Sequence, residues 1–328
     1  MADKKVGTIV YRHNLSPILS IFRLVPDVGC TFPEYDAGQY IALRREDCRL
    51  TKKIMGPDGQ PQYVPDLDET GTQRRGPVAH SYSISSAPYE TIRHGYLEFY
   101  VILEMQEEGT PGRLTESLFQ VDPDGDNQII YFDRITGDFS LPKRSKGFQN
   151  VVMIGTGSGL APFAAMIKQL QYRAEQGWTD NVRYTLIHAN RSLRELGYHG
   201  EFLSIEEEQK FDFVYVASVS RPTEQDLKDS DIGKGRANNL LRHVFGMPLK
   251  EEQALEEASA RSVSTEAAQA ALKRTIRPQL PGRISRQDLR ARIGGENSVI
   301  LCCGNPLSMA DIQHVAETNN VRFEKEDW

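Results

Sequence analysis

The spacing of apolar residues changes near residue 145 and divides the chain into two halves. Before that point, short apolar or alternating runs are separated by clusters of Pro, Gly, Asn and Asp, which is typical of strands joined by turns. After it, apolar strand-like runs alternate with stretches of helical periodicity. We expect strands at 6–11, 18–24, 39–44, 81–85, 96–103 and 128–132, and then at 151–154, 182–188, 213–219 and 299–303.

This change predicts two domains of different architecture. The first pattern favours an antiparallel Greek-key β-barrel over residues 1–145, and the second favours a Rossmann-like parallel α/β domain over residues 146–328. Two segments are expected to be insertions. Residues 48–79 form a polar loop that is longer than usual, and a helical insertion spans about 233–281. Its Glu- and Ala-rich part, residues 249–274, predicts solvent-exposed helix.

Composition narrows the class of protein. The 328 residues are 39% hydrophobic and 26% charged, as in ordinary globular proteins, and the net charge of -6 argues against nucleic acid as the main partner. We find no apolar run of membrane-spanning length and no signal-peptide core after the first residues, so no membrane insertion is expected. The four cysteines lack metal or iron–sulfur spacing. We therefore expect a cytoplasmic protein with no bound metal.

A glycine-rich turn follows the apolar run that ends at Ile154. Its sequence is Gly155-Thr156-Gly157-Ser158-Gly159-Leu160-Ala161-Pro162. Small residues after a strand let backbone N–H groups and a helix N-terminus approach a phosphate closely, and Pro162 suits the first turn of that helix. The turn predicts a nucleotide ligand, with a tight structural turn as the alternative.

Arginines follow two strands of the second half. These strands end in Asn190-Arg191 and Ser220-Arg221, where an NAD site usually has a carboxylate near the second strand. Arginine guanidinium groups match the geometry and charge of a 2′-phosphate, so these ends favour NADP(H) over NAD(H). Arg283 is a further candidate, and surface salt bridges are the alternative interpretation.

The first half carries two stretches suited to a flavin. In His80-Ser81-Tyr82-Ser83, a strand edge can set an aromatic ring against a planar cofactor. In Gly112-Arg113-Leu114-Thr115, backbone donors, a hydroxyl and an arginine can bind a pyrophosphate. Taken singly, either stretch is more typical of an ordinary serine-rich strand or a helix cap.

Taken together and in this order, the motifs resemble those of the ferredoxin–NADP(H) reductase family, whose members pair an FAD-binding barrel with an NADP-binding domain. The resemblance extends over most of the chain and leaves out the two insertions. It rests on Gly38-Gln39-Tyr40, Tyr82-Ser83, Gly112–Thr115, Gly137-Asp138-Phe139-Ser140-Leu141, Gly155–Pro162, Ser220-Arg221 and Cys303-Gly304-Asn305-Pro306.

The resemblance implies roles for individual residues. Tyr82 would stack on the isoalloxazine and Ser83 would lie near flavin N5, while Cys303 would lie beside the nicotinamide. Trp328, the last residue, would cover the flavin, and Glu326 resembles a carboxylate found two residues before that aromatic in some members. Ser83, Cys303, Glu326 and Trp328 are the implied catalytic group.

The implied cofactor sites are larger sets. For FAD they comprise His80, Ser81, Tyr82, Ser83, Tyr100, Gly112, Arg113, Leu114, Thr115 and Trp328. For NADP they comprise Gly155, Thr156, Gly157, Ser158, Gly159, Pro162, Arg191, Ser220, Arg221, Arg283, Cys303 and Gly304. One departure is clear, because the family normally has arginine where this chain has His80. Pyrophosphate binding would therefore depend more on Arg113.

The implied activity is that of an FAD-dependent oxidoreductase, which exchanges hydride with NADP(H) and single electrons with ferredoxin or flavodoxin. Acidic partners of this kind suit a basic surface, for which the candidates are Arg44, Arg45, Lys52, Lys53, Arg74 and Arg75. Three alternatives stay open. They are an NAD(P)H-dependent flavin reductase or oxygenase reductase component, a non-catalytic electron-transfer subunit, and a methyltransferase that uses the glycine-rich turn.

Overall fold

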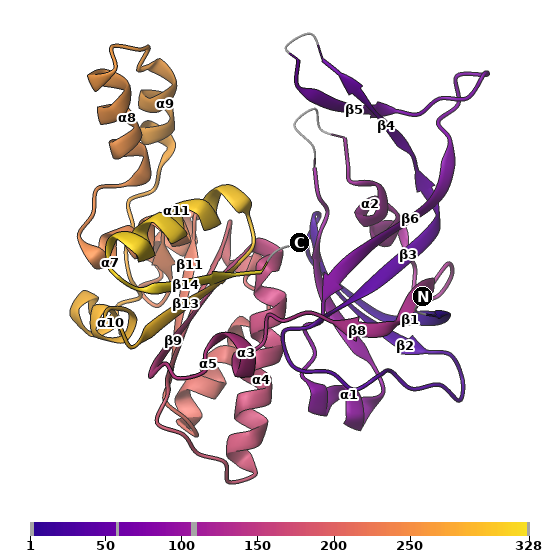
Figure 1. Cartoon of the computed structure of the whole chain (residues 1–328), viewed down its shortest axis with the longest axis horizontal. Coiled ribbons are helices and arrows are strands. Elements are labelled where there is room, and N and C mark those ends of the chain that lie inside the picture. Colours follow the sequence, from indigo (N-terminus) through magenta and orange to yellow (C-terminus); the bar gives the residue numbers. More distant parts are fainter. Residues whose placement is uncertain (1–2, 57–58, 106–109, 327–328) are drawn as a thin grey trace. The chain divides into compact units, whose positions relative to one another are not determined.

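The computed structural model describes residues 3–56, 59–105 and 110–326, and the chain divides into two compact units, Met1–Gly137 and Asp138–Trp328 (Figure 1). The division lies between Gly137 and Asp138, whereas the sequence pattern placed it between residues 145 and 146. The short helix α3 (Leu141–Arg144) belongs to the second unit, because Arg144 pairs with Glu324 of strand β14 (Arg322–Lys325) at 2.9 Å.

The first unit is a curled six-stranded antiparallel sheet. Its strand order is β6-β3-β8-β1-β2-β7, and all six expected strands are present. A backbone hydrogen bond 2.8 Å long runs from the N–H of Ser85, two residues after β6, to the Glu98 carbonyl of β7, the other edge strand. Phe22, Leu43 and Phe99 fill the core. The strands are β1 (Lys4–Ser16), β2 (Leu19–Pro26), β3 (Tyr40–Arg49), β6 (Arg75–Ser83), β7 (Leu97–Ile102) and β8 (Gln128–Thr136).

Two helices accompany this sheet, α1 (Pro88–His94) and α2 (Arg113–Gln120). Leu114 and Leu118 of α2 are buried in the sheet's core, so the N-terminus of α2 has a fixed position beside β3 and β6.

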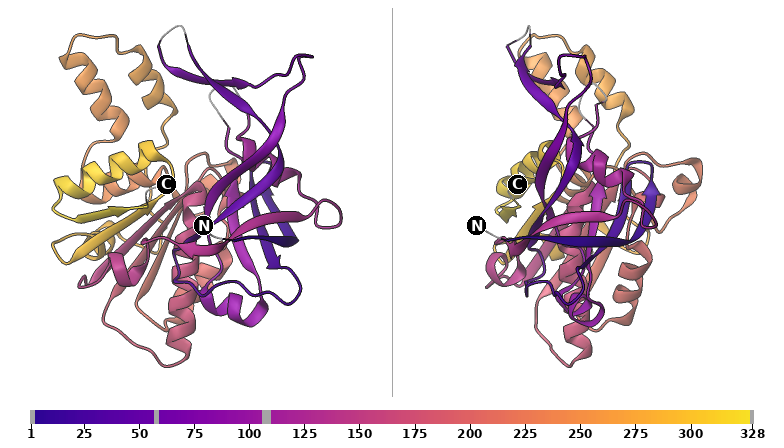
Figure 2. Two further views of the ribbon diagram at one scale, coloured as in Figure 1. Left: turned by 45° about the vertical axis from the view of Figure 1, so that its right-hand side comes forward. Right: turned by 90° about the vertical axis from the view of Figure 1, so that its right-hand side faces the viewer.

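Residues 48–79 are an arm rather than the expected loop. The strands β3 and β6 continue beyond the expected ranges, and a separate antiparallel hairpin of β4 (Thr51–Met55) and β5 (Pro61–Pro65) follows them. Figures 1 and 2 show this hairpin extending beyond the curled sheet. Met55 and Tyr63 are exposed. The strands were missed because neither has the buried face that produces alternation of apolar and polar residues.

The second unit is a six-stranded parallel sheet between two helical layers. Its order is β12-β11-β10-β9-β13-β14, so the chain enters at an inner strand and places β10 and β13 on opposite sides of it. The carboxyl ends of β9 and β13 therefore form the switch point at which such sheets bind ligands. The strands are β9 (Asn150–Thr156), β10 (Arg183–Asn190), β11 (Phe213–Val219), β12 (Gly233–Lys234), β13 (Ser298–Cys303) and β14.

Different helices cover the two faces of this sheet. Ile154, Val216 and Ile300 pack against α7 (Ala237–Phe245), α10 (Arg286–Ile293) and α11 (Pro306–Thr318). On the other face lie α4 (Ala161–Glu175) and α5 (His199–Glu208), and the Phe202 ring of α5 contacts Tyr215 of β11. A short helix, α6 (Glu224–Lys228), follows β11. Among the residues described, none of the helices has the length and apolar character needed to cross a bilayer.

The helical insertion is smaller than expected. The range 233–281 includes β12 and α7, and α7 belongs to the helical layer because Leu240, Leu241 and Val244 are buried against the sheet. Only α8 (Lys250–Ala260) and α9 (Glu266–Arg274) project, as both views in Figure 2 show. Of the described residues in these two helices only Glu251 is buried, whereas Leu249, the first residue of the range 249–274 that was expected to be exposed helix, is buried at the N-cap of α8.

Candidate functional site

The glycine-rich turn lies directly against the end of β13. A β-carbon on Gly159 would come within 2.2 Å of the Cys303 carbonyl oxygen, and one on Gly304 within 2.1 Å of the Thr156 Oγ1. Gly304 also has a φ of +133°, which favours glycine. The two motifs that sequence analysis placed at an NADP site are therefore in backbone contact.

The same turn begins a helix. Residues Gly157–Leu160 form a 3-10 turn that leads into α4, and the Thr156 hydroxyl accepts a hydrogen bond from the Asn305 N–H at 3.1 Å. Backbone N–H groups at the start of a helix have no partner within it and can bind an anion. Pro162 itself is buried, so its part is to start α4 rather than to contact a ligand.

Cys303 and Glu326 form a buried pair beside this turn. The Cys303 thiol donates a hydrogen bond to the Glu326 carboxylate over 3.1 Å. Burial of Cys303 raises its pKa well above the usual value, and the adjacent Glu326 charge raises it further. The thiol is therefore protonated at neutral pH and is not a nucleophile. Cys302 lies on the opposite face of β13, in the core against α7 and α11, as the alternation of the strand predicts.

The ends of β10 and β11 meet as expected. The Arg221 N–H donates to the Arg191 carbonyl at 2.7 Å, and the Ser220 N–H donates to the Asn190 carbonyl at 2.9 Å. Arg191, Ser220 and Arg221 line one cavity of about 450 Å³. The Arg191 guanidinium also forms a two-pronged ion pair with the buried Glu195 carboxylate, which fixes its direction.

Two further arginines line this cavity, and sequence analysis missed both. Arg236 lies at the N-cap of α7, next to β12, and Arg274 lies at the end of α9. The Gly233-Lys234-Gly235-Arg236 stretch could have indicated the first, because glycines flank a strand end there, but a two-residue strand gives no periodic signal. Nothing in the sequence indicates that Arg274 faces the same cavity.

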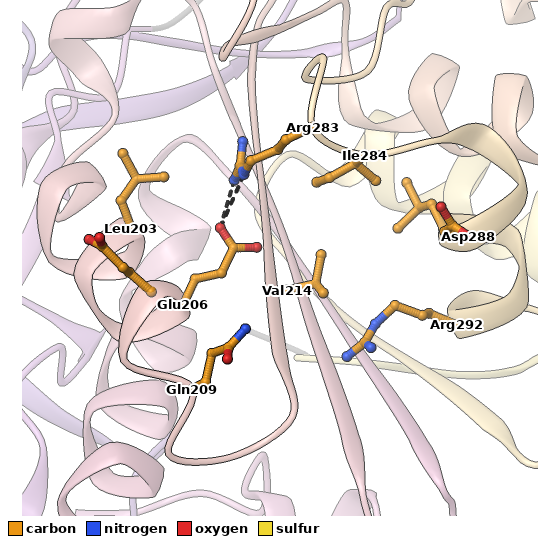
Figure 3. A pocket seen from close by; sticks show the side chains of 10 residues that line it. Leu203, Glu206, Gln209, Val214, Arg283, Ile284, Asp288 and Arg292 are labelled. Atoms are coloured by element: carbon orange, nitrogen blue, oxygen red, sulfur yellow. Dashed lines mark hydrogen bonds and ion pairs between the residues drawn. The ribbon is translucent and has the colours of Figure 1, made fainter.

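Arg283 does not join these arginines. Its guanidinium pairs with Glu206 of α5 at 2.9 Å and donates to the Tyr215 carbonyl at 2.5 Å, as part of a different cavity of about 560 Å³ (Figure 3). Glu206 also accepts from the Tyr215 N–H at 2.9 Å. The pair therefore satisfies both backbone groups of Tyr215, where β12 is too short to cover β11. Arg283 therefore has a structural role at β11 and does not line the cavity of Arg191 and Arg221. Its sequence-based assignment to the NADP site is corrected accordingly.

The turn at Gly112–Thr115 in the first unit is a close-packed helix start. Gly112 is the N-cap of α2, and its carbonyl accepts from the Thr115 hydroxyl at 3.1 Å. A β-carbon on Gly112 would lie 2.8 Å from that hydroxyl oxygen and 3.1 Å from a carboxylate oxygen of Glu104. Only glycine fits here, because the Thr115 hydroxyl and the Glu104 side chain already occupy the position of a β-carbon.

His80 faces this turn from β6. Partial burial of its ring holds the pKa of His80 below the usual 6.5, the positive charge of Arg113 lowers it further, and Glu104 acts in the opposite direction. His80 is therefore mainly neutral at pH 7. The cluster carries one positive charge from Arg113 and one negative charge from Glu104, a balance that sequence analysis did not foresee because Glu104 lay outside the motifs.

The remaining flavin candidates lie on β6 and β7. Tyr82 shares a face of β6 with His80 and packs half-buried against the core of the first unit, where burial raises the pKa of its hydroxyl. Ser81 is exposed, and Ser83 is buried opposite Tyr40 of β3. Tyr100 is buried on the face of β7 opposite to Phe99.

One motif pair of the first unit also comes together. The Gln39 side chain donates to the Gly137 carbonyl at 2.9 Å, and a β-carbon on Gly137 would lie 3.0 Å from the Tyr40 ring. Apart from Trp328, the FAD candidates thus lie in the first unit, and the NADP candidates lie in the second. Trp328 lies outside the described residues.

The second unit also resembles a known protein family in sequence. Residues 153–255 match the family model of the oxidoreductase NAD-binding domain. No curated protein matches the chain in sequence.

Solved structures resemble the whole chain. A ferredoxin NADP+ reductase from Neisseria gonorrhoeae, solved with bound FAD and NADP, matches 99% of each chain with a TM-score of 0.57 and 18% identity. The FAD/NAD-binding domain of nitric oxide dioxygenase from Vibrio cholerae covers 99% of this chain and 98% of its own, with a TM-score of 0.58 and 16% identity. The cytochrome b5 reductase domain of Ulva prolifera nitrate reductase covers 99% and 97%, with a TM-score of 0.53 and 13% identity. At identities this low, the structural similarity establishes a shared fold and nothing further.

Proposed function

We propose that this chain is an FAD-dependent oxidoreductase, because it shares its fold with a ferredoxin NADP+ reductase and an FAD/NAD-binding domain, and because residues 153–255 match the oxidoreductase NAD-binding domain. In this proposal it exchanges hydride with NADP(H) and single electrons with a protein such as ferredoxin or flavodoxin. Function on this fold depends on the site, so the proposal rests on the residues described above.

The single observation that carries the NADP(H) part is the arginine-lined cavity at the strand ends. Arg191, Ser220 and Arg221 line it together with Arg236. A 2′-phosphate offers two negative charges and several acceptor oxygens, and guanidinium groups bind such oxygens in pairs. An NAD site would present a carboxylate to the ribose hydroxyls at this place. The pyrophosphate of the same ligand would bind at Gly155–Gly159.

The residues of the first unit fit FAD at the N-terminus of α2. Gly112 begins α2 without a side chain, because Thr115 and Glu104 pack closely against it, and Arg113 brings a positive charge to the same helix N-terminus. Gly112, Arg113, Leu114 and Thr115 would hold the FAD pyrophosphate through backbone N–H groups and the arginine. Tyr82 would contact the flavin ring system. Ser81, Ser83 and Tyr100 are the other proposed FAD residues.

FAD supplies the chemistry of such a reaction, because it accepts a hydride and can release electrons one at a time. The chain's own residues would orient the reactants. The buried, protonated Cys303 would present an uncharged side chain beside the nicotinamide. The Glu326 carboxylate would fix the orientation of the thiol by accepting its hydrogen bond. Gly304 would let the ligand approach the backbone. Ser83 is the proposed hydroxyl near the flavin, and Trp328 the proposed cover of its ring.

A protein partner that carries single electrons would need a docking surface. Of the six basic candidates, Arg45 is unsuitable because it is buried and pairs with Asp126 and Asp47, and Arg44 pairs with Glu46. Lys52 and Lys53 on β4 and Arg74 just before β6 are exposed on or beside the hairpin arm. Arg75, the first residue of β6, is exposed as well, but its guanidinium donates to the Asp47 carbonyl at 3.1 Å. We propose this arm as the surface for an acidic partner.

Anaerobic stopped-flow reduction tests the proposal. The FAD-loaded protein is mixed with NADPH or NADH while the flavin absorbance is followed. Rapid bleaching with NADPH, and bleaching at least tenfold slower with NADH, is expected. A protein that binds no FAD would overturn the proposal, whereas equal rates would overturn only its NADP(H) part. Reduction of ferredoxin rather than of free flavin by the NADPH-reduced protein distinguishes the proposed activity from a flavin reductase.

A further inference from the structure

The α8–α9 insertion forms one wall of the arginine-lined cavity. Glu251 of α8 and Ala271, Arg274, Thr275 and Ile276 at the end of α9 line the cavity opposite Arg191, Ser220 and Arg221. Of the described residues in these two helices only Glu251 is buried. An insertion built for stability would bury apolar side chains, so the position of this one beside a polar cavity calls for another explanation.

The insertion is firmly attached at both of its ends. The Glu251 carboxylate accepts from Asn239 of α7 at 2.8 Å, and the Asn239 side chain in turn accepts from the Lys250 N–H at 3.0 Å. At the other end, Gln279 exchanges backbone hydrogen bonds with Lys234 of β12, 2.8 and 2.9 Å long. These contacts fix the base of the insertion at the edge of the cavity.

Charge in the cavity is only partly balanced. Arg191 pairs with Glu195, and Arg236 pairs with Glu251 at 3.2 Å. Arg221 and Arg274 have no carboxylate partner among the residues that the structure describes, and the Arg274 guanidinium donates to the Ala270 carbonyl of its own helix at 3.1 Å. Two positive charges therefore face the cavity without compensation. A phosphate monoester carries about two negative charges at neutral pH.

We propose that the insertion is a specificity element of the nucleotide site, in which Arg274 binds the phosphate monoester of the ligand together with Arg221. Glu251 holds Arg236 while the cavity is empty, and the phosphate competes with Glu251 for that arginine. This rests on the NADP(H) function proposed above. The ligand class is a nucleotide with a monoester phosphate on its adenosine ribose.

Calorimetric titration of the full-length, FAD-loaded protein tests the role of Arg274 without measuring turnover. The probes are adenosine 2′,5′-bisphosphate and adenosine 5′-monophosphate, which lacks the 2′-phosphate. Arg274→Gln is expected to weaken the bisphosphate about tenfold, the usual effect of losing a charge-assisted hydrogen bond, and to leave the monophosphate nearly unchanged. Lys273→Gln is the matched control, because it removes the same charge one residue away, outside the cavity lining.

The outcomes separate this proposal from the one on which it rests. If Arg221→Gln weakens the bisphosphate but Arg274→Gln does no more than Lys273→Gln, the insertion has no part in binding and this proposal is wrong. If neither arginine matters, the NADP(H) assignment itself fails.

Glu251→Gln and hydrogen exchange provide a second check that does not depend on the Arg274 variant folding. Removing the Glu251 charge is expected to strengthen bisphosphate binding severalfold, because Arg236 loses its competing partner. In the unmodified protein, the bisphosphate is expected to slow amide exchange in residues 271–276, whereas the monophosphate is not. Equal exchange with and without the bisphosphate would contradict the proposal.

Discussion

The Cys303 thiol and the Glu326 carboxylate share a hydrogen bond 3.1 Å long, and both side chains are almost completely buried. A thiol beside a carboxylate in an apolar setting keeps its proton, because the thiolate would be both desolvated and repelled. Cys303 therefore differs from the reactive cysteines that serve as nucleophiles. Its chemistry is that of a small, neutral, slightly polar side chain.

Cysteine labelling checks this conclusion. Cys30 is exposed, whereas Cys48, Cys302 and Cys303 are buried with raised pKa values. We expect one fast-reacting thiol with a disulfide reagent at pH 8 and three that react only after unfolding. Cys30→Ser should remove the fast phase. Rapid modification of Cys303 in the folded protein, identified by peptide mass, would contradict the buried arrangement.

Nucleotide preference should depend on Arg221 and not on Arg283. Arg221→Gln is expected to slow flavin reduction by NADPH about tenfold with little change for NADH, because only NADPH carries the lost phosphate contact. Arg283→Gln serves as the control of equal charge. It should leave the preference unchanged and lower the free energy of unfolding by about 1 kcal/mol, since it removes the hydrogen bonds that Arg283 donates to Glu206 and to the Tyr215 carbonyl. A change of preference in the Arg283 variant would place that residue in the site after all.

A side chain at Gly159 should disrupt the second unit. Its β-carbon would collide with the Cys303 carbonyl at 2.2 Å, and backbone on both sides leaves no space for adjustment. We expect Gly159→Ala to lower the free energy of unfolding by about 3 kcal/mol, measured with urea. Gly200→Ala is the control, because a β-carbon on this residue of α5 meets nothing within 4 Å. That variant should be neutral or slightly stabilised.

A buried ion pair joins α7 to α11 beneath the insertion. Arg242 donates to the Asp311 carboxylate at 2.6 and 2.9 Å, and Asn238 donates to it at 2.8 Å. Arg242 also bonds Gln253 of α8 at 2.9 Å. Burial favours the neutral form of Asp311, but the hydrogen bonds from Arg242 and Asn238 outweigh it and hold the pKa of Asp311 below the usual 3.8.

Asp311→Asn is expected to lower the free energy of unfolding by about 3–5 kcal/mol at pH 7, because Arg242 is left buried without a counter-charge. A depressed carboxyl pKa contributes stability above its unfolded value of 3.8, and this contribution disappears as pH falls through the lower folded value. The difference between the two proteins should therefore shrink below pH 3.8. Urea unfolding from pH 7 to pH 3 measures it, and a difference that stays constant would show that Asp311 is not ionised.

FAD affinity should respond to the charges around Gly112. Glu104 opposes a pyrophosphate at this turn, so Glu104→Gln is expected to tighten FAD binding severalfold. His80 should help only once protonated, so FAD affinity should rise as pH falls below 6.5, and this rise should vanish in His80→Gln. Fluorescence titration of the apoprotein with FAD measures both. Weaker binding by the Glu104 variant would exclude the pyrophosphate from this turn.

Sequence reasoning succeeded where local pattern and position agree. The six strands of the first sheet, the inner strands of the second and the meeting of Arg191 with Arg221 all follow from periodicity and from the rule that parallel strands end at one edge. It failed for contacts that depend on tertiary packing. Arg283 and Arg236 both lie in short, glycine-containing segments, and only the course of the chain after β12 shows that Arg236 faces the cavity.

The insertions show the same limit. Exposed strands such as β4 and β5 leave no buried face to detect, and the Glu- and Ala-rich composition of α8 and α9 predicts exposure without indicating what the helices cover. Glu104 was missed for a similar reason, because its proximity to Gly112 arises from the packing of a loop against α2.

The contact of Gly159 and Gly304 with the neighbouring backbone has an evolutionary consequence. These two positions tolerate no side chain, so a substitution at either one disrupts the packing and cannot adjust the site gradually. The arginine cavity is built from side chains on four separate segments, each of which can change alone. The proposed cofactor preference can therefore change through single substitutions in descendants of this chain, while the turn proposed to bind the pyrophosphate stays fixed.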